Sequence, residues 1–312
     1  MLKGIALKVA ATFVFAAMAA LIKLASGRFP VGEVVLFRSV VALVVLTGWL
    51  RWRGEFPAAL ATRRPLGHIG RSLAGTGGMY ASFLALGLLP LADATAFTFA
   101  TPLMITPLAV ALLGEVAPAY RWGAVGAGFV GVIIMLSDHL GAASPARALG
   151  STIALSGALC AAVAMIQTRR LTLSEPTGAI VFYFSSVTMT VAGLSLALAA
   201  LWPEAPWIGS QAFVAPGFWE MAALVAIGAL GGTGQILMTQ SYRYADASVI
   251  AAFDYVSMIW ASALGFWLFN EAPTLRVLLG AGVVAGAGAY VVWRVRRLGR
   301  QPITAEVAAP SV

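Results

Sequence analysis

Two charged residues, Arg38 and Asp254, stand inside long apolar stretches of the sequence, at 32–50 and 246–269. A charge at the centre of a membrane-spanning helix costs about 3 kcal/mol on insertion scales, so such residues seldom face lipid. They bind a polar or charged ligand, or they are neutralised inside the protein. We therefore predict that Arg38 and Asp254 bind a ligand. The alternative is a structural role, as an ion pair or with Arg38 held by backbone carbonyls.

Helix geometry separates these two charges in depth. If both stretches are helices that cross a bilayer, Arg38 and Asp254 differ in depth by roughly 9 Å, a gap that could hold a small ligand. Nearby aromatic and polar side chains could stack on a flat ring and bind its polar edge. The substrate-binding residues that we predict are Arg38, Tyr80, Thr98, Thr101, Gln235, Asp254, Tyr255 and Trp260.

Some of these residues have an alternative role. Thr98 and Thr101 form a polar stripe with Thr95, but a threonine hydroxyl in a helix often bonds the preceding turn of its own backbone. Trp260 points away from the helix face that carries Asp254, which favours packing over ligand binding.

The composition places these residues in a membrane protein. The chain is 60% hydrophobic and 10% charged, and its mean hydropathy is +0.90, which no single soluble core could accommodate. The apolar stretches predict about ten membrane-spanning helices. They lie near 5–25, 32–50, 69–89, 92–113, 122–137, 151–168, 177–200, 220–241, 246–269 and 275–293. The first contains Lys8 and lacks a convincing cleavage site, so we interpret it as a span and not as a signal peptide.

Lysine and arginine residues predict the orientation, because basic residues near the ends of spans stay in the cytoplasm. An inside N-terminus places Lys3, Lys8, Arg51, Arg53, Arg63, Arg64, Arg71, Arg121, Arg169, Arg170, Arg243, Arg294, Arg296, Arg297 and Arg300 on the inner side. Arg28, Arg147 and Arg276 are left for the outer side. Both termini are then cytoplasmic, and the net charge of +8 reflects orientation and not nucleic-acid binding.

The sequence contains an internal repeat. The stretches 89–115 and 242–271 both open on Ala-Asp-Ala, at Asp93 and Asp246, and both close on a glutamate, Glu115 and Glu271. We predict a first repeat over 1–140, a second over 150–297 and a disordered cytoplasmic tail over 298–312. Five spans in each repeat would insert the two copies with opposite orientations, the inverted repeat of many secondary carriers.

The repeated carboxylates suggest structural roles at helix ends. We predict that Asp93 and Asp246 are N-caps of the fourth and ninth helices, and that Glu115 and Glu271 cap the helices that follow them. Lys23, which aligns with Arg169, is interpreted as a lysine whose ammonium reaches the outer interface.

Glycines recur at matching positions of the two repeats. We predict close helix contacts at Gly78 and Gly231, and at Gly282 and Gly286 in the last span. For the last two, packing within the chain is favoured, and a homodimer contact is the alternative. One cysteine, Cys160, excludes a disulfide and a cysteine-based metal site, and His68 and His139 lie far apart in the predicted topology. We expect no metal and no cofactor.

Three features together resemble a known family. These are the repeated Ala-Asp-Ala…Pro…Leu-Gly-Glu pattern, the start Lys23…Pro30…Arg38 and the run RWGAVGAGFVGVIIM. Over residues 4–297 they are similar to the EamA branch of the drug/metabolite transporter superfamily. The resemblance implies a ten-helix inner-membrane carrier with a cavity lined by the first, third, fourth, sixth, eighth and ninth helices. The first half is similar to carriers of S-adenosylmethionine or riboflavin, and the second half departs from the pattern around Asp254 and Tyr255.

We therefore expect a secondary transporter of the bacterial inner membrane that moves a small polar metabolite, amino-acid-like, S-adenosylmethionine-like or riboflavin-like. An exporter of amino acids or drug-like compounds is the alternative within transport. An intramembrane enzyme would need a nucleophile–base pair or metal-ligand spacing, and neither occurs in the sequence. A membrane scaffold is the remaining alternative.

Overall fold

The computed structural model describes residues 2–113, 117–140, 145–172, 174–204, 212–244 and 256–297. Within these ranges the regular structure is helical and contains no strand. The helices are α1 (Leu2–Ala25), α2 (Val31–Trp52), the short 3-10 helix η1 (Ala58–Leu60), α3 (Pro65–Leu88), α4 (Leu91–Thr98), α5 (Ala100–Leu113), α6 (Ala119–Leu140), α7 (Pro145–Thr172), α8 (Thr177–Leu201), α9 (Phe218–Tyr244), α11 (Val256–Phe269) and α12 (Leu275–Arg297). The predictions for Glu115, Asp246, Asp254, Tyr255 and 298–312 lie outside the described residues.

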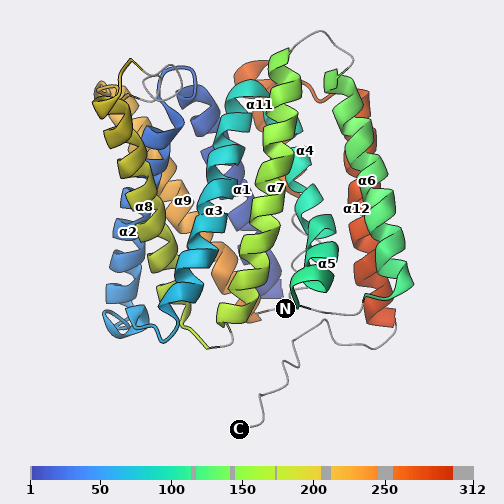
Figure 1. Ribbon diagram of the computed structural model, residues 1–312, viewed down its shortest axis with the longest axis horizontal. Helices are drawn as coiled ribbons and strands as arrows, with labels where there is room; N and C mark the ends of the chain where they lie inside the picture. The colour runs from blue at the N-terminus through green and yellow to red at the C-terminus, as the bar shows by residue number, and fades with distance from the viewer. Residues whose placement is uncertain are drawn as a thin grey trace.

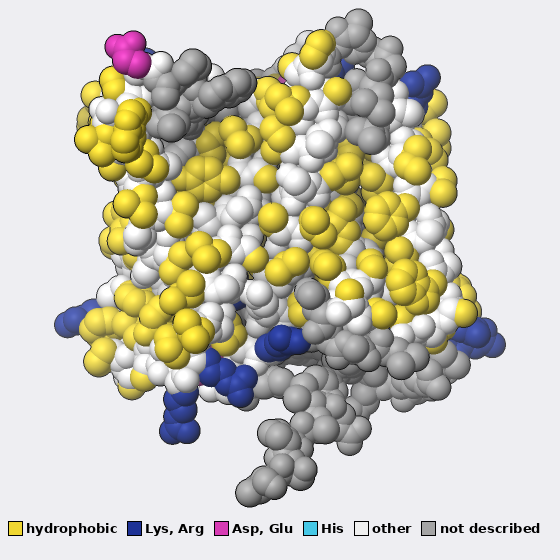
Figure 2. Space-filling view, viewed as in Figure 1, with side chains coloured by type: hydrophobic (Ala, Val, Ile, Leu, Met, Phe, Trp, Pro, Cys, Tyr) yellow, Lys and Arg dark blue, Asp and Glu magenta, His cyan; other side chains and the backbone are white. Residues whose placement is uncertain are grey.

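The predicted helical membrane fold is confirmed. Each of the ten predicted spans contains a helix, and the ninth is described from Val256 onward. By length and composition, the described residues of α1, α2, α7, α8 and α9 suffice to cross a membrane, and α6, α11 and α12 contain shorter apolar segments. Figure 2 shows hydrophobic side chains over the middle of the visible face, as a surface in contact with lipid requires.

The fourth predicted span is broken into two helices. α4 ends at Thr98 and α5 starts at Ala100, with Phe99 between them. Pro102 explains the position of the break, because proline has no N–H to donate to the carbonyl four residues earlier, that of Thr98. A second proline, Pro107, lies inside α5.

The helices form a bundle with α2 and α8 at one side and α6 and α12 at the other (Figure 1). α3 packs on α7 and α1 packs on α9, and two further contacts are α2 with α9 and α3 with α8. If the helices of each half are matched in order, α1 corresponds to α7, α2 to α8, α3 to α9 and α6 to α12. Each of these contacts then has a partner contact in which the two halves are exchanged.

Glycines allow two of these helix pairs to approach closely. A Cβ at Gly78 would lie 3.2 Å from the carbonyl oxygen of Gly157 on α7, and one at Gly131 would lie 2.7 Å from that of Gly280 on α12. At Gly282 and Gly286 an added Cβ meets no atom within 4 Å. The helix contact that we favoured within the chain is therefore wrong for these two, because α12 turns Gly280 toward α6 instead.

Lys23 closes one end of the bundle and does not act as an interfacial lysine. Its ammonium donates to the carbonyl oxygen of Leu89 at 2.6 Å and lies 3.2 Å from Glu271 Oε1. The second oxygen of Glu271 accepts from the N–H of Leu91, the first residue of α4. The prediction that Glu271 caps its following helix is wrong, since Thr274 accepts from Val277 there. We call Lys23, Glu271, Leu89 and Leu91 the Lys23 cluster.

One further prediction from the sequence is corrected, and the burial of two basic residues adds to another. Asp93 is not an N-cap, because Pro90 holds that position and Asp93 lies buried in the first turn of α4. Lys8 and Arg71 were assigned to the inner side of the membrane, which stays a prediction, and their exposed fractions of 1% and 9% show that they lie inside the bundle. The simple count of basic residues therefore mixed interfacial charges with interior ones.

Candidate functional site

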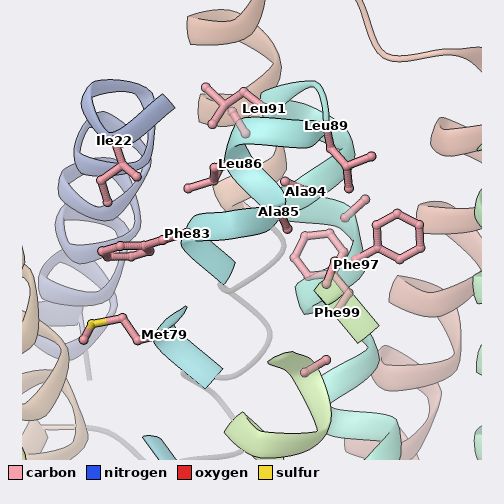
Figure 3. Close-up of a cluster of buried hydrophobic side chains, with 14 of the residues drawn as sticks. Ile22, Met79, Phe83, Ala85, Leu86, Leu89, Leu91, Ala94, Phe97 and Phe99 are labelled. Carbon is pink, nitrogen blue, oxygen red and sulfur yellow. The ribbon is translucent and has the colours of Figure 1, made fainter. Parts of the chain in front are cut away.

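A cavity of about 140 Å³ lies between α1, α3, α4 and α7. Its walls are mainly apolar, and Figure 3 shows several of them, Ile22 on α1, Phe83 and Leu86 on α3 and Ala94 on α4. The lining residues are Met18, Ala19, Ile22, Ser82, Phe83, Ala85, Leu86, Ala94, Thr95, Thr98 and Ala154. These helices are four of the six that the family resemblance implied for a central cavity, and they come from both halves of the chain.

The broken fourth span contributes two polar residues of the cavity wall, beside Ser82 of α3. Thr95 donates its hydroxyl proton to the carbonyl of Leu91 at 2.8 Å, and Thr98 donates to that of Thr95 at 2.7 Å. Both hydroxyls therefore bond their own helix, but each keeps oxygen lone pairs that can accept from a ligand. Thr101 is half-buried on α5 and is not part of the wall.

Arg38 lies buried in the bundle, with 5% of its surface exposed. Its Nε and Nη1 have no hydrogen-bond partner among the described residues. Gly231 makes room for it on α9, since a Cβ there would lie 3.1 Å from Arg38 Nε and equally 3.1 Å from Met18 Sδ. Arg38 Nε and Met18 Sδ are therefore at most about 6 Å apart, and Met18 lines the cavity whereas Arg38 does not.

Arg71 is the interior charge that our site prediction missed. Its Nε donates to the hydroxyl of Thr168 at 3.0 Å, whereas its Nη1 has no partner among the described residues. Its guanidinium carbon lies 4.3 Å from the ring centroid of Phe184, and that of Arg38 lies 5.6 Å from the same centroid. We call Arg38, Arg71 and Phe184 the arginine cluster.

A signal for Arg71 was present in the sequence. The repeats match Gly75 with Gly228, which places Leu224 opposite Arg71. Arg38 was selected because it is charged in one repeat and apolar, at Phe184, in the other. The same test would have selected Arg71.

The other predicted site residues that the structure describes are not part of the cavity wall. Tyr80 is half-buried, and its hydroxyl lies 3.2 Å from that of Ser195, so it links α3 to α8. Gln235 is half-buried on α9. Trp260 packs edge-to-face on Phe13 of α1, with ring centroids 5.3 Å apart, in agreement with the packing alternative. Asp254 and Tyr255 lie outside the described residues, so their place in the site remains a prediction.

The arrangement suits reversible binding more than bond chemistry. Within the described ranges, no three His, Cys, Asp or Glu side chains lie together as metal ligands would. The apolar cavity, the two threonines and the arginine cluster instead offer shape, hydrogen-bond acceptors and positive charge.

Comparison with known proteins gives a family match over most of the chain. The sequence model of the EamA-like transporter family matches residues 2–137 and 148–294. A solved crystal structure aligns with a TM-score of 0.67 and covers 96% of this chain and 99% of that one. The sequence identity to it is 21%, so this likeness supports the fold alone.

Three curated relatives extend over most of the chain. The pseudopaline exporter of Pseudomonas aeruginosa (strain UCBPP-PA14) is 26% identical over 285 residues, which cover 91% of this chain and 94% of that protein. The S-adenosylmethionine uptake transporter of Rickettsia prowazekii is 26% identical over 261 residues, covering 84% and 82%. The riboflavin transporter of Rhizobium johnstonii is 27% identical over 249 residues, covering 78% and 76%.

Proposed function

Because the chain belongs to the EamA-like transporter family, whose members are membrane transporters and not enzymes, we propose that it is a secondary transporter of a small polar metabolite. The observation that carries this proposal is the cavity between helices of both halves, bordered by the break between α4 and α5. Broken helices at mid-membrane commonly form substrate sites in secondary carriers. Exchange of access between the two sides of the membrane would then move the substrate.

The helix contacts support an inverted repeat. The contacts of α3 with α7 and of α1 with α9 are exchanged counterparts, as are those of α2 with α9 and of α3 with α8, which is expected if a two-fold axis relates the halves. With five spans in each half, that axis lies in the membrane plane. Alternating access by rocking of one half against the other follows from this arrangement.

The distribution of charge supports an orientation with cytoplasmic termini. Figure 2 shows most of the visible Lys and Arg side chains along the lower edge, which in the same view of Figure 1 is the edge where α12 ends. Basic residues favour the cytoplasmic face. The relatives are bacterial proteins, so we place the chain in a bacterial inner membrane.

The relatives differ in what they carry, and the proposal is correspondingly broad. Their names include a pseudopaline exporter, an S-adenosylmethionine uptake transporter and a riboflavin transporter. We propose an amino-acid-like, S-adenosylmethionine-like or riboflavin-like substrate, with export of amino acids or drug-like compounds as the alternative. The proposal includes no cofactor and no nucleic-acid partner. The open face at Gly282 and Gly286 is where a homodimer contact would form.

Flux through proteoliposomes tests the transporter proposal. The purified chain would be reconstituted and offered radiolabelled S-adenosylmethionine, riboflavin and a mixture of amino acids, with inward and outward gradients in separate series. We expect saturable flux of one of them, well above that of empty liposomes. Absence of saturable flux for every compound in both directions would reject a carrier of these substrate classes.

The orientation has its own test. Single cysteines at residue 63 and at residue 213, in a Cys160→Ser background, would be exposed to a membrane-impermeant thiol reagent on intact cells. We expect labelling at 213 and none at 63, and the reverse pattern would overturn the proposed orientation.

A further inference from the structure

We propose that the arginine cluster binds an oxyanion, such as the carboxylate or phosphate group of the transported compound. This inference rests on the proposed function and specifies its substrate class, an anion with an apolar body.

The two guanidiniums converge from different helices. Arg38 comes from α2, Arg71 from α3 and Phe184 from α8. The guanidinium carbons lie 5.6 and 4.3 Å from the centroid of the Phe184 ring, so they are at most about 10 Å from each other. Hydrogen bonds from arginine to an oxyanion are about 2.8 Å long, so one group with several oxygens can reach both guanidiniums if they lie on the same side of the ring, where their separation is shorter than this limit.

The donors of the cluster are incompletely used. Each guanidinium has five N–H groups, and buried donors normally have a partner. Three of these donors have no hydrogen-bond partner among the described residues, namely Arg38 Nε, Arg38 Nη1 and Arg71 Nη1. Water does not readily replace such a partner, because only 5% of Arg38 and 9% of Arg71 is exposed. Contact with the face of Phe184 attracts the positive charge but takes up no N–H donor. An oxyanion would satisfy these donors and reduce the repulsion between the two cations.

Comparison of the two repeats indicates that the fold does not need the charges of Arg38 and Arg71. In the second repeat, Phe184 occupies the position equivalent to Arg38, and Leu224 occupies the position equivalent to Arg71. Both are buried hydrophobic residues, with exposed fractions of 7% and 0%. The same helical framework is thus completed by apolar side chains in one half, and the two arginines are an addition specific to the first half.

The cavity supplies a place for the remainder of such a ligand. Met18 lines the cavity and also stands next to Arg38 at Gly231. At about 140 Å³, the cavity has room for a small apolar group. A compound with its apolar part there and its anionic group toward Arg38 would use both regions.

Anion titration of the purified chain tests the proposal without requiring the substrate. Sodium sulfate and sodium acetate would be added in a neutral detergent, at ionic strength held constant with sodium chloride, while the apparent melting temperature is recorded. Ligands that bind the folded state alone raise its stability in a saturable manner. We expect saturable stabilisation by sulfate, with an affinity at least tenfold weaker in Arg38→Met and in Arg71→Met.

The matched control is Arg51→Met. Arg51 belongs to α2 like Arg38 and also lies over an aromatic ring, 5.7 Å from the centroid of Phe56, but it is exposed. Its sulfate response should equal that of the wild type. Arg71→Lys, which keeps the charge, should recover part of the affinity lost in Arg71→Met.

Stability without sulfate separates a ligand site from a structural pair. If the arginines wait for a ligand, Arg38→Met and Arg71→Met should melt at or above the wild-type temperature in chloride, since removing an unpaired buried charge relieves a cost. A large loss of melting temperature in both, or a wild type that does not respond to sulfate, would overturn the proposal.

The source of the anion is tested with lipid. Nanodiscs of phosphatidylcholine should preserve the sulfate response, and nanodiscs of phosphatidylglycerol should preserve it too. If phosphatidylglycerol removes the response, a lipid headgroup occupies the cluster and the assignment to a transported solute is wrong. Sulfate binding without any flux in proteoliposomes would leave the anion site standing and reject transport, so the two failures are distinguishable.

Discussion

The Lys23 cluster and the arginine cluster both place positive charge between helices, but they differ in whether the cation has a carboxylate partner among the described residues. In the Lys23 cluster the ammonium meets Glu271 at 3.2 Å and the carbonyl of Leu89 at 2.6 Å. In the arginine cluster, no described carboxylate lies within salt-bridge distance of either guanidinium. The first is completed within the described chain, and the second has no carboxylate partner there, as the proposed oxyanion site requires.

The difference separates a structural role from a binding role. Lys23 and Leu91 belong to the first half and Glu271 to the second, so their contacts join the halves at one end of the bundle. A buried pair is costly to break because one charge is left unpaired. Unpaired guanidiniums cost stability while the site is empty, a cost that is retained only where the charge serves another purpose.

The largest effect on stability is expected from Lys23→Met. The variant leaves the Glu271 carboxylate without its cation, with 27% of that side chain exposed, and we expect a loss of about 2 kcal/mol in the free energy of unfolding. The apparent melting temperature in detergent should fall by several degrees. In contrast, Arg38→Met should show no such fall in the same assay.

Arg28→Met is the control for losing an ion pair at the same end of the bundle. Arg28 pairs with Glu220, but 59% of its side chain is exposed, and exposed pairs contribute about 0–1 kcal/mol. If Lys23→Met and Arg28→Met lower the melting temperature equally, the Lys23 cluster has no special structural role.

The bundle could be predicted from the sequence because its causes are local. Apolar length predicts the spans, and these occur as expected, and Pro102 accounts for the break after Thr98 from the local sequence. The partners of charged residues could not be predicted in this way, because they come from distant parts of the chain. Lys23 meets Glu271, so its ammonium is bound within the chain and does not extend to the outer interface as expected.

The candidate site was predicted only in part. Thr98 lines the cavity, whereas Tyr80 and Trp260 bond or pack elsewhere because helix rotation decides where a side chain points. Arg71 was assigned to orientation, since an arginine six residues inside a helix end has the same local sequence whether it faces water or the interior.

A smaller, pH-dependent effect is expected at Glu175, in the connection between α7 and α8. Burial acts to raise the pKa of this carboxyl, but hydrogen bonds from Thr62 and the N–H of Arg63, and the contact with His68, outweigh it and lower the pKa. A lowered pKa stabilises the folded state above the unfolded pKa, and this stability is lost as the pH falls through the folded value.

Glu175→Gln should therefore remove part of the acid dependence of the melting temperature. The wild type should lose stability between the ordinary glutamate pKa and more acidic pH, and the variant should show a flatter curve there. Like Glu271, Glu175 accepts from the other half of the chain, at the N–H of Arg63. An unchanged acid slope would show that Glu175 is not held in its charged form by these contacts.

The smallest effect on stability is expected from Gly231→Ala. This variant instead tests whether Arg38 of the arginine cluster is held in position to bind an anion. The added Cβ would lie 3.1 Å from Arg38 Nε and from Met18 Sδ, both on flexible side chains that can move by a few tenths of an ångström. Alanine also gains up to about 1 kcal/mol over glycine within a helix, which offsets the crowding. The melting temperature should therefore change little. The displaced guanidinium should bind sulfate several-fold more weakly, however, because charge-assisted hydrogen bonds depend on donor geometry.

Gly282→Ala is the matched control, since its Cβ meets no atom within 4 Å, and it should leave sulfate affinity unchanged. Equal sulfate affinity in wild type, Gly231→Ala and Gly282→Ala would mean that Arg38 is not held in place for an anion.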